Sequence, residues 1–212
     1  MDIFRLLAAA AFIFCLSSLV YQMTKLLIAG NKRDFSKPSG SEKDGIVYSF
    51  TGAMSPFEKE SAYLHLPTYI AGLLFHFGVF LSFPVLLLMI IFPKILFISQ
   101  YLTASISLFL LISSFSGLFI LVKRIVKRDI RAISGADDYI SNGLTTFSLL
   151  MSSIALLTET LVPLYFVVYS VLLVWVPIGK TRHLIYFFFA RYHLGRFYGR
   201  RNSWPQKKVS NG

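Results

Sequence analysis

Long apolar runs restrict the fold of this sequence more than any other feature. Several of them reach the roughly 18 to 20 residues that an α-helix needs to cross about 30 Å of hydrocarbon. Hydrophobic residues make up 55% of the 212 residues, and the mean hydropathy is +0.65. A soluble domain is usually about 45–50% apolar. The pattern predicts an all-α integral membrane protein with little chain left for a soluble domain.

Five such runs are separated by polar or basic connections, which predicts a bundle of five transmembrane helices. We expect spans at about residues 6–23, 66–92, 97–122, 139–157 and 161–191. Pro, Gly and Ser in the first long loop argue against a packed domain there, although its second half, 46–57, could form a short ordered piece. The expected domains are a first transmembrane helix, a cytoplasmic loop, a four-helix membrane domain and a flexible basic tail, at 1–30, 31–64, 65–201 and 202–212.

Basic residues gather on one side of the predicted bundle. The net charge is +11, and 19 of the 21 Lys and Arg residues fall in the first loop, in the loop after the third span, or in the C-terminal tail. Such segments are cytoplasmic by the positive-inside rule. We therefore expect the N-terminus outside and the C-terminus in the cytoplasm. Orientation in the membrane explains the charge, and no nucleic-acid partner is expected.

The residue types exclude several kinds of chemistry. Cys15 is the single cysteine, so the chain can form neither an internal disulfide nor an iron–sulfur cluster held by four cysteines. No nucleophile–base set and no glycine-rich phosphate loop occurs, so no catalytic residues are predicted. If the protein transfers electrons, its cofactor is bound by histidine or the cluster belongs to another subunit.

Two histidines stand within apolar runs, His76 in the second span and His183 near the inner end of the fifth. At 1.5 Å per residue they lie about 24 Å and about 30 Å from the outer ends of their spans, a difference that helix tilt can absorb. Two neutral imidazoles at one depth on antiparallel helices could ligate one b haem from both sides. Gly78 would leave room for a porphyrin face, and the expected propionate-binding cations are Lys180, Arg182 and Arg191.

Other interpretations of the histidines stay open at this point. Each could instead hydrogen-bond across a helix interface, as polar groups in membrane helices often do. His65 and His193 lie about 15 Å inward of His76 and His183 along their helices, so they too could face one another and hold a second haem. Histidines are also common at helix ends near the membrane interface.

The residues around this histidine pair resemble a known family. The segment LFHFG at 74–78, the five-span layout and PIGKTRH at 177–183 resemble the gamma subunit of respiratory nitrate reductase. They are also similar to the membrane cytochrome b subunits of heterodisulfide-reductase-like complexes. The tail YFFFARYHLGRFYGRR at 186–201 and DDY at 137–139 look most like that second group. The resemblance covers about residues 66–201.

In that family four histidines on two helices bind two b haems, and only the inner pair is matched here, by His76 and His183. The outer pair would fall at Leu86 and Tyr165, neither of them a usual haem ligand. The resemblance thus implies one b haem near the cytoplasmic face of a prokaryotic inner membrane. It implies a membrane-anchoring subunit, non-catalytic or quinone-reacting, that passes electrons between the quinone pool and a cytoplasmic iron–sulfur or catalytic subunit.

Two alternatives carry no redox role. The chain could be a cofactor-free membrane anchor, in which the histidines only pack against neighbouring helices. It could also be a transporter component, because Pro84 and the serine-rich third span would suit a broken or closely packed helix. No pair of charged residues lies in the middle of a predicted span, which disfavours the transporter.

Overall fold

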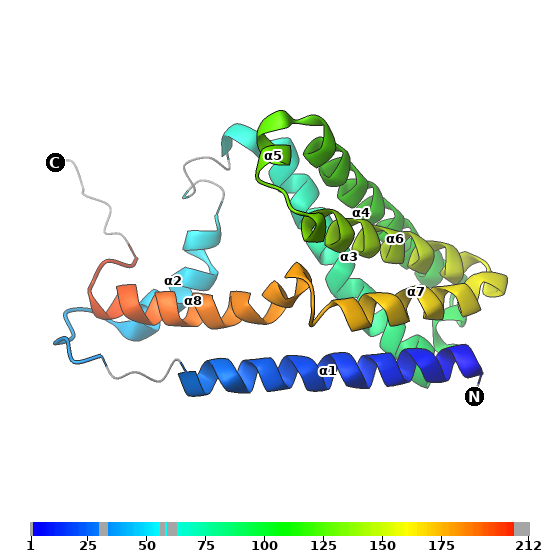
Figure 1. Cartoon of the computed structure of the whole chain (residues 1–212), viewed down its shortest axis with the longest axis horizontal. Coiled ribbons are helices and arrows are strands. Elements are labelled where there is room, and N and C mark those ends of the chain that lie inside the picture. The colour runs from blue at the N-terminus through cyan, green and yellow to red at the C-terminus, as the bar shows by residue number, and fades with distance from the viewer. Residues whose placement is uncertain (1, 30–33, 56–57, 59–62, 206–212) are drawn as a thin grey trace. The chain divides into compact units, whose positions relative to one another are not determined.

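The computed structural model describes residues 2–29, 34–55, 58 and 63–205. These residues form α-helices and short 3-10 helices and contain no strand, so the all-α prediction is confirmed for the described part of the chain (Figure 1). The α-helices are α1 (Ile3–Ala29), α2 (Glu42–Phe50), α3 (Leu66–Ile91), α4 (Gln100–Val126), α5 (Arg128–Ala132), α6 (Ala136–Leu157), α7 (Val162–Trp175) and α8 (His183–Arg200).

Four of these helices are long and apolar enough to cross a membrane, namely α1, α3, α4 and α6. A fifth span exists only if the broken pair Glu159–Trp175 and Lys180–Arg200 is counted as one. The predicted second, third and fourth spans match α3, α4 and α6 to within four residues at each end. The helices fit the predicted multi-pass arrangement, while the orientation of the termini stays a prediction.

The fifth predicted span is not one continuous helix, and the prediction of a helix over 161–191 is wrong. Helix α7 ends at Trp175, a turn follows, and a 3-10 helix (Lys180–Arg182) precedes α8. Pro177 has no backbone N–H, so it cannot continue the hydrogen-bond ladder of α7. The Gly179 amide donates to the Trp175 carbonyl at 2.8 Å, and a Cβ on Gly179 would lie 2.4 Å from the Trp175 indole nitrogen. A side chain at position 179 would therefore require the Trp175 indole to move.

The chain divides into two compact units, which do not follow the predicted domain ranges. Unit 1 comprises Met1–Ser18 and Pro67–Thr181, and unit 2 comprises Leu19–Leu66 and Arg182–Gly212. Unit 1 thus holds the start of α1 with α3 to α7. Unit 2 holds the end of α1 with α2 and α8.

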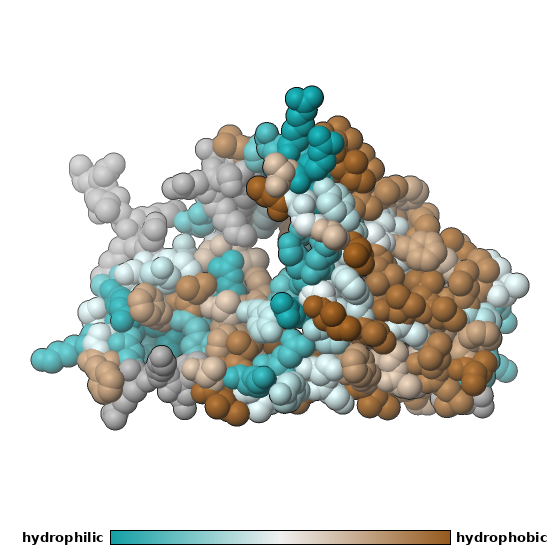
Figure 2. All heavy atoms as spheres, viewed as in Figure 1, coloured by the Kyte–Doolittle hydropathy of each residue, from teal (hydrophilic) through white to brown (hydrophobic). Residues whose placement is uncertain are grey.

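Small side chains bring the helices of unit 1 close together. The Ser107 hydroxyl on α4 donates to the Ser153 carbonyl on α6 at 2.9 Å, and Ser114 donates to the Thr146 carbonyl at 3.0 Å. Such residues let membrane helices approach and hydrogen-bond across their interface. The serine content of the third predicted span therefore has a packing role. The opposite faces of these helices carry exposed apolar side chains, which cover much of the visible surface of this unit (Figure 2).

In unit 2 the loop predicted at 31–64 contains a packed helix, contrary to expectation. Helix α2 lies against α8, and glycines on both helices form their contact. A Cβ on Gly45 would lie 2.3 Å from the Gly195 carbonyl oxygen, and one on Gly199 would lie 2.5 Å from the Ser41 carbonyl oxygen. We call this backbone contact of Gly45, Gly195 and Gly199 the glycine seam. The sequence predicted an ordered piece at 46–57, whereas the helix begins earlier, at Glu42.

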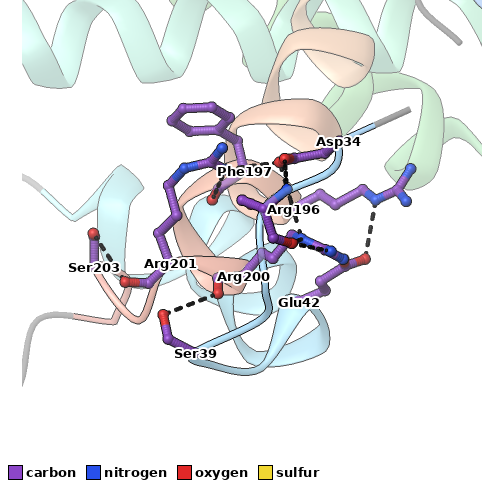
Figure 3. A network of polar contacts seen from close by, with 9 residues as sticks. Asp34, Ser39, Glu42, Arg196, Phe197, Arg200, Arg201 and Ser203 are labelled. Atoms are coloured by element: carbon purple, nitrogen blue, oxygen red, sulfur yellow. Dashed lines mark hydrogen bonds and ion pairs between the residues drawn. The ribbon is translucent and has the colours of Figure 1, made fainter. Parts of the chain in front are cut away.

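Ion pairs extend the contact between α2 and α8 beyond the glycine seam (Figure 3). Glu42 accepts from Arg200 at 2.9 Å and from Arg196 at 3.0 Å, and Asp34 pairs with Arg201 at 2.9 Å. The Arg200 hydrogen bond lowers the pKa of Glu42. The hydrogen bonds from Ser36, then that from Arg201, lower the pKa of Asp34 to about 2.

Candidate haem-ligand site

His76 lies in the interior of α3 with its side chain exposed. Its Nδ1 is 2.7 Å from the carbonyl oxygen of Gly72, one turn earlier in the same helix. Because a carbonyl oxygen only accepts, Nδ1 carries the proton, and the acceptor lone pair of the neutral ring is on Nε2. Histidines that ligate metals usually hold their second ring nitrogen in this way. The geometry suits His76 as an Nε2 ligand.

The exposed face of α3 around His76 is apolar and open. Leu73, Phe77 and Phe80 are 41%, 59% and 49% exposed. A Cβ on Gly72 would meet nothing within 4 Å. A flat apolar group could therefore approach His76 from this side of the helix.

Gly78 has a different role from the one predicted for it. It is buried, and a Cβ there would lie 2.2 Å from Cβ of Ser113 on α4. Residues two apart in a helix point to nearly opposite sides, so Gly78 faces α4 rather than the side of α3 that carries His76. The expectation that Gly78 clears a porphyrin face is wrong, and the open glycine beside His76 is Gly72.

His183 is the first residue of α8, is exposed, and belongs to unit 2. The predicted depth of about 30 Å assumed an unbroken helix from residue 163 to 183, at 1.5 Å per residue. The break at residues 176–179 invalidates that count. His76 belongs to unit 1, so a shared site remains a proposal.

The three predicted propionate-binding cations have other contacts. Lys180 Nζ lies 2.6 Å from Asp138 Oδ2. The guanidinium carbons of Arg182 and Arg191 lie 6.0 Å and 5.6 Å from the ring centroids of Tyr186 and Phe187. Arg182, next in sequence to His183, is exposed, and stacking on an aromatic ring leaves its N–H groups able to donate.

The other two histidines both belong to unit 2. His65 is exposed and ends a 3-10 helix (Tyr63–His65) immediately before α3. His193 is half-buried on α8, with its ring centroid 4.2 Å from that of Phe189 and 5.3 Å from that of Tyr192. These contacts give His193 a packing role.

Leu86 and Tyr165, the positions at which the resemblance would place the outer haem ligands, lie in the core of unit 1. Leu86 is 0% exposed and Tyr165 is 1% exposed. Close-packed side chains occupy these positions, and neither side chain is an iron ligand of the type the resemblance requires.

A polar cluster that the sequence did not predict lies at the start of α6. Asp138 pairs with both Lys180 and Arg124, the latter at 3.7 Å, and also accepts from the Gly135 amide at 2.9 Å. Asp137 accepts from the Lys180 amide at 3.0 Å and from the Ser141 hydroxyl at 2.7 Å. This cluster fixes the chain just after the break in the fifth predicted span. The DDY segment in the sequence was a signal for it, but its partners come from two other parts of the chain.

The glycine seam is the second feature that sequence reasoning missed. Gly195 and Gly199 form a GxxxG motif, a known signature of close helix contacts in membrane proteins. The motif could have been recognised, but its partner Gly45 lies in a segment whose composition is typical of a loop.

No protein-family model matches this sequence, and neither a curated protein nor a solved structure shows significant similarity to it. The fold and the surface therefore define the class by themselves: the described part of the chain is all-α, and its four to five long apolar helices fit a multi-pass membrane protein. Such helices imply contact with membrane lipids.

Proposed function

We propose that the protein is a membrane-anchoring, b-type electron-transfer subunit in which His76 and His183 ligate one haem. The observation that carries the proposal is the geometry of His76. Its exposed ring lies within an apolar helix, and its Nδ1 donates to the Gly72 carbonyl, so Nε2 is the atom that would bind iron. An ionisable side chain in such a helix is costly, and it usually has a function.

His183 is the proposed second ligand. It is exposed at the start of α8, directly after the break that the Asp137–Asp138 cluster supports. Arg182 is the adjacent cation for a propionate, and Arg191, two turns further along α8, is a second. When bound, the haem would supply reversible one-electron transfer. The chain itself would orient the imidazoles and balance the propionate charge.

The proposed partners follow from what the chain lacks and from where its charges lie. With a single cysteine it cannot supply an iron–sulfur cluster of its own. We propose a cytoplasmic iron–sulfur subunit as one electron partner and membrane quinone as the other, in a prokaryotic inner membrane. The basic residues of α8 would lie on the cytoplasmic side under the positive-inside orientation.

A cofactor-free membrane anchor is the second candidate, and one observation favours it. The bond from His76 Nδ1 to Gly72 and the ring contacts of His193 are the contacts that packing histidines make. His76 and His193 would then contribute to stability alone. This anchor would be colourless.

The test is the absorption spectrum of the purified full chain, oxidised and dithionite-reduced, from cells supplied with haem. We expect one haem per chain in the wild type, with loss of the haem in both His76→Ala and His183→Ala. His65→Ala and His193→Ala are the matched controls and should retain it. A folded wild-type chain without haem would overturn the proposal, as would full haem retention in either His76→Ala or His183→Ala.

A further inference from the structure

An apolar groove lies between α3 and α4, at the end of unit 1 where α3 begins and α4 ends. Its volume is about 390 Å³, within the roughly 300–1,000 Å³ that is typical of ligand sites. The residues that line it include Pro67, Ala71 and Leu74 of α3 and Ile112, Ser116 and Phe119 of α4. They recur every three or four positions, so each set occupies one face of its helix. The walls of the groove are therefore the facing sides of α3 and α4.

The groove is open and offers almost no polar group. Ile70 and Phe115, which also line it, are 52% and 61% exposed. Among the described residues of the lining, Ser116 alone has a polar side chain, and its hydroxyl donates to the Ile112 carbonyl within α4 at 3.0 Å. An apolar chain is therefore the kind of group that the groove accommodates.

A lysine follows directly on the groove-lining face of α4. Lys123 lies four residues after Phe119, so the two share one face of the helix. Its ammonium group donates to the Thr68 hydroxyl on α3, which places it across the end of the groove. A hydroxyl is neutral and leaves the positive charge uncompensated. The ion pairs of the described residues match Arg124 with Asp138 and do not include Lys123.

The position of the charges gives the depth of the groove in the membrane. Beyond Lys123, the next cations Lys127, Arg128 and Arg131 are all exposed. Charged residues are costly in hydrocarbon, so this end of the groove lies at the membrane surface. From Pro67 to Leu74 the helix rises about 10 Å, which is about two-thirds of the roughly 15 Å that one leaflet contributes. The groove therefore has the depth of an acyl chain whose headgroup is level with Lys123.

We propose that the groove binds an acyl chain of one anionic phospholipid and that Lys123 binds the phosphate of its headgroup. Lysine is a common phosphate ligand and acts as a point charge. A zwitterionic lipid carries a cation that offsets its phosphate, so Lys123 favours the anionic lipid. Residues two apart in a helix point to nearly opposite sides, so Leu74 in the groove and His76 lie on different sides of α3. The proposal therefore involves neither proposed haem ligand.

The first test is native mass spectrometry of the full chain in detergent, titrated with phosphatidylglycerol or with phosphatidylcholine of the same acyl chains. We expect one tightly bound phosphatidylglycerol, with a Kd about fivefold lower than that of phosphatidylcholine. Lys123→Gln should raise the Kd of phosphatidylglycerol about fivefold, the effect of one basic residue near a charged headgroup. Lys94→Gln is the matched control, because Lys94 is exposed at the opposite end of the same two helices. Equal affinity for the two lipids, or equal loss in both variants, would overturn the headgroup assignment.

The second test fills the groove itself. Ser116→Leu places apolar atoms where the acyl chain lies, and it should raise the Kd of both lipids about tenfold if about two methylene groups are displaced. Ser105→Leu is the control, since Ser105 is exposed on α4 but does not line the groove. Unchanged lipid binding in Ser116→Leu would overturn the proposal. The same spectra count the chains, and a dimer that only Ser116→Leu dissociates would assign the groove to a second copy instead.

Discussion

The glycine seam between α2 and α8 makes the sharpest prediction about stability. We consider Gly195→Ala. An added Cβ would lie 2.5 Å from Cα of Ile46 and 2.8 Å from the carbonyl oxygen of Gly45. Carbon atoms in contact normally lie about 3.5–4.0 Å apart. Because the opposing atoms belong to the backbone, no side-chain rotation can relieve the overlap, and α2 must move away from α8.

The expected cost follows from two opposing terms. Overpacking of this kind destabilises by about 1–3 kcal/mol, and backbone overlap belongs at the upper end. Alanine recovers up to about 1 kcal/mol of helix propensity in α8. The net loss is about 1–2 kcal/mol, which increases the open population of the α2–α8 contact about 5- to 30-fold.

Hydrogen exchange of the α2 amides, followed by mass spectrometry on the full chain, measures this opening directly. The amides of residues 42–50 should exchange about 5 to 30 times faster in Gly195→Ala than in the wild type. Gly143→Ala on α6 is the control, since the nearest atom to its added Cβ lies 3.9 Å away. Unchanged α2 exchange in Gly195→Ala would refute the close backbone contact.

Three further predictions concern other contacts. Lowering the pH should loosen the α2–α8 contact, because the lowered pKa values of Glu42 and Asp34 stabilise this contact at pH values above their usual pKa values of 4.5 and 3.8. That stability is lost as the pH falls through the pKa values of the folded state. Trp204 fluorescence in a Trp175→Phe background should therefore change below about pH 4.5, and it should change less in Glu42→Gln. Asp138→Asn should lower the free energy of unfolding by about 1 kcal/mol, because it loses the helix cap and the ion pairs of Asp138. Thermal unfolding can measure this loss, and the exposed Asp129→Asn is the control that should stay near wild type. Gly78→Ala should destabilise by about 1–3 kcal/mol through its overlap with Ser113, and the double variant with Ser113→Gly should recover part of the loss; no recovery would contradict the α3–α4 contact.

The sequence predicted the spans of unit 1 well, because uninterrupted apolar runs determine where helices can cross a membrane. The second span is the clearest case, predicted at 66–92 and observed as Leu66–Ile91. The break after Trp175 was missed, although Pro177 and Gly179 are signals of a helix end. Apolar residues on both sides hid it, because hydropathy alone does not distinguish one long helix from two.

The site was less predictable than the spans. The tautomer of His76 depends on a bond to a backbone carbonyl, which the sequence cannot show. Gly78 was predicted to lie on the same side of its helix as His76. The helical period of 3.6 residues places it on nearly the opposite side, and this was already available from the sequence. The α2–α8 contact joins Gly45 to Gly195, 150 residues apart, and local composition carries no signal for such a pairing.

Electron paramagnetic resonance of the oxidised wild-type chain tests the central claim most directly, because the signal of a low-spin ferric haem identifies its axial ligands. The account predicts one bis-imidazole species per chain, converted to a histidine–methionine species in His183→Met and likewise in His76→Met. The account would be contradicted if the bis-imidazole signal survived in either variant, or if the haem-loaded wild type gave a signal with only one histidine ligand.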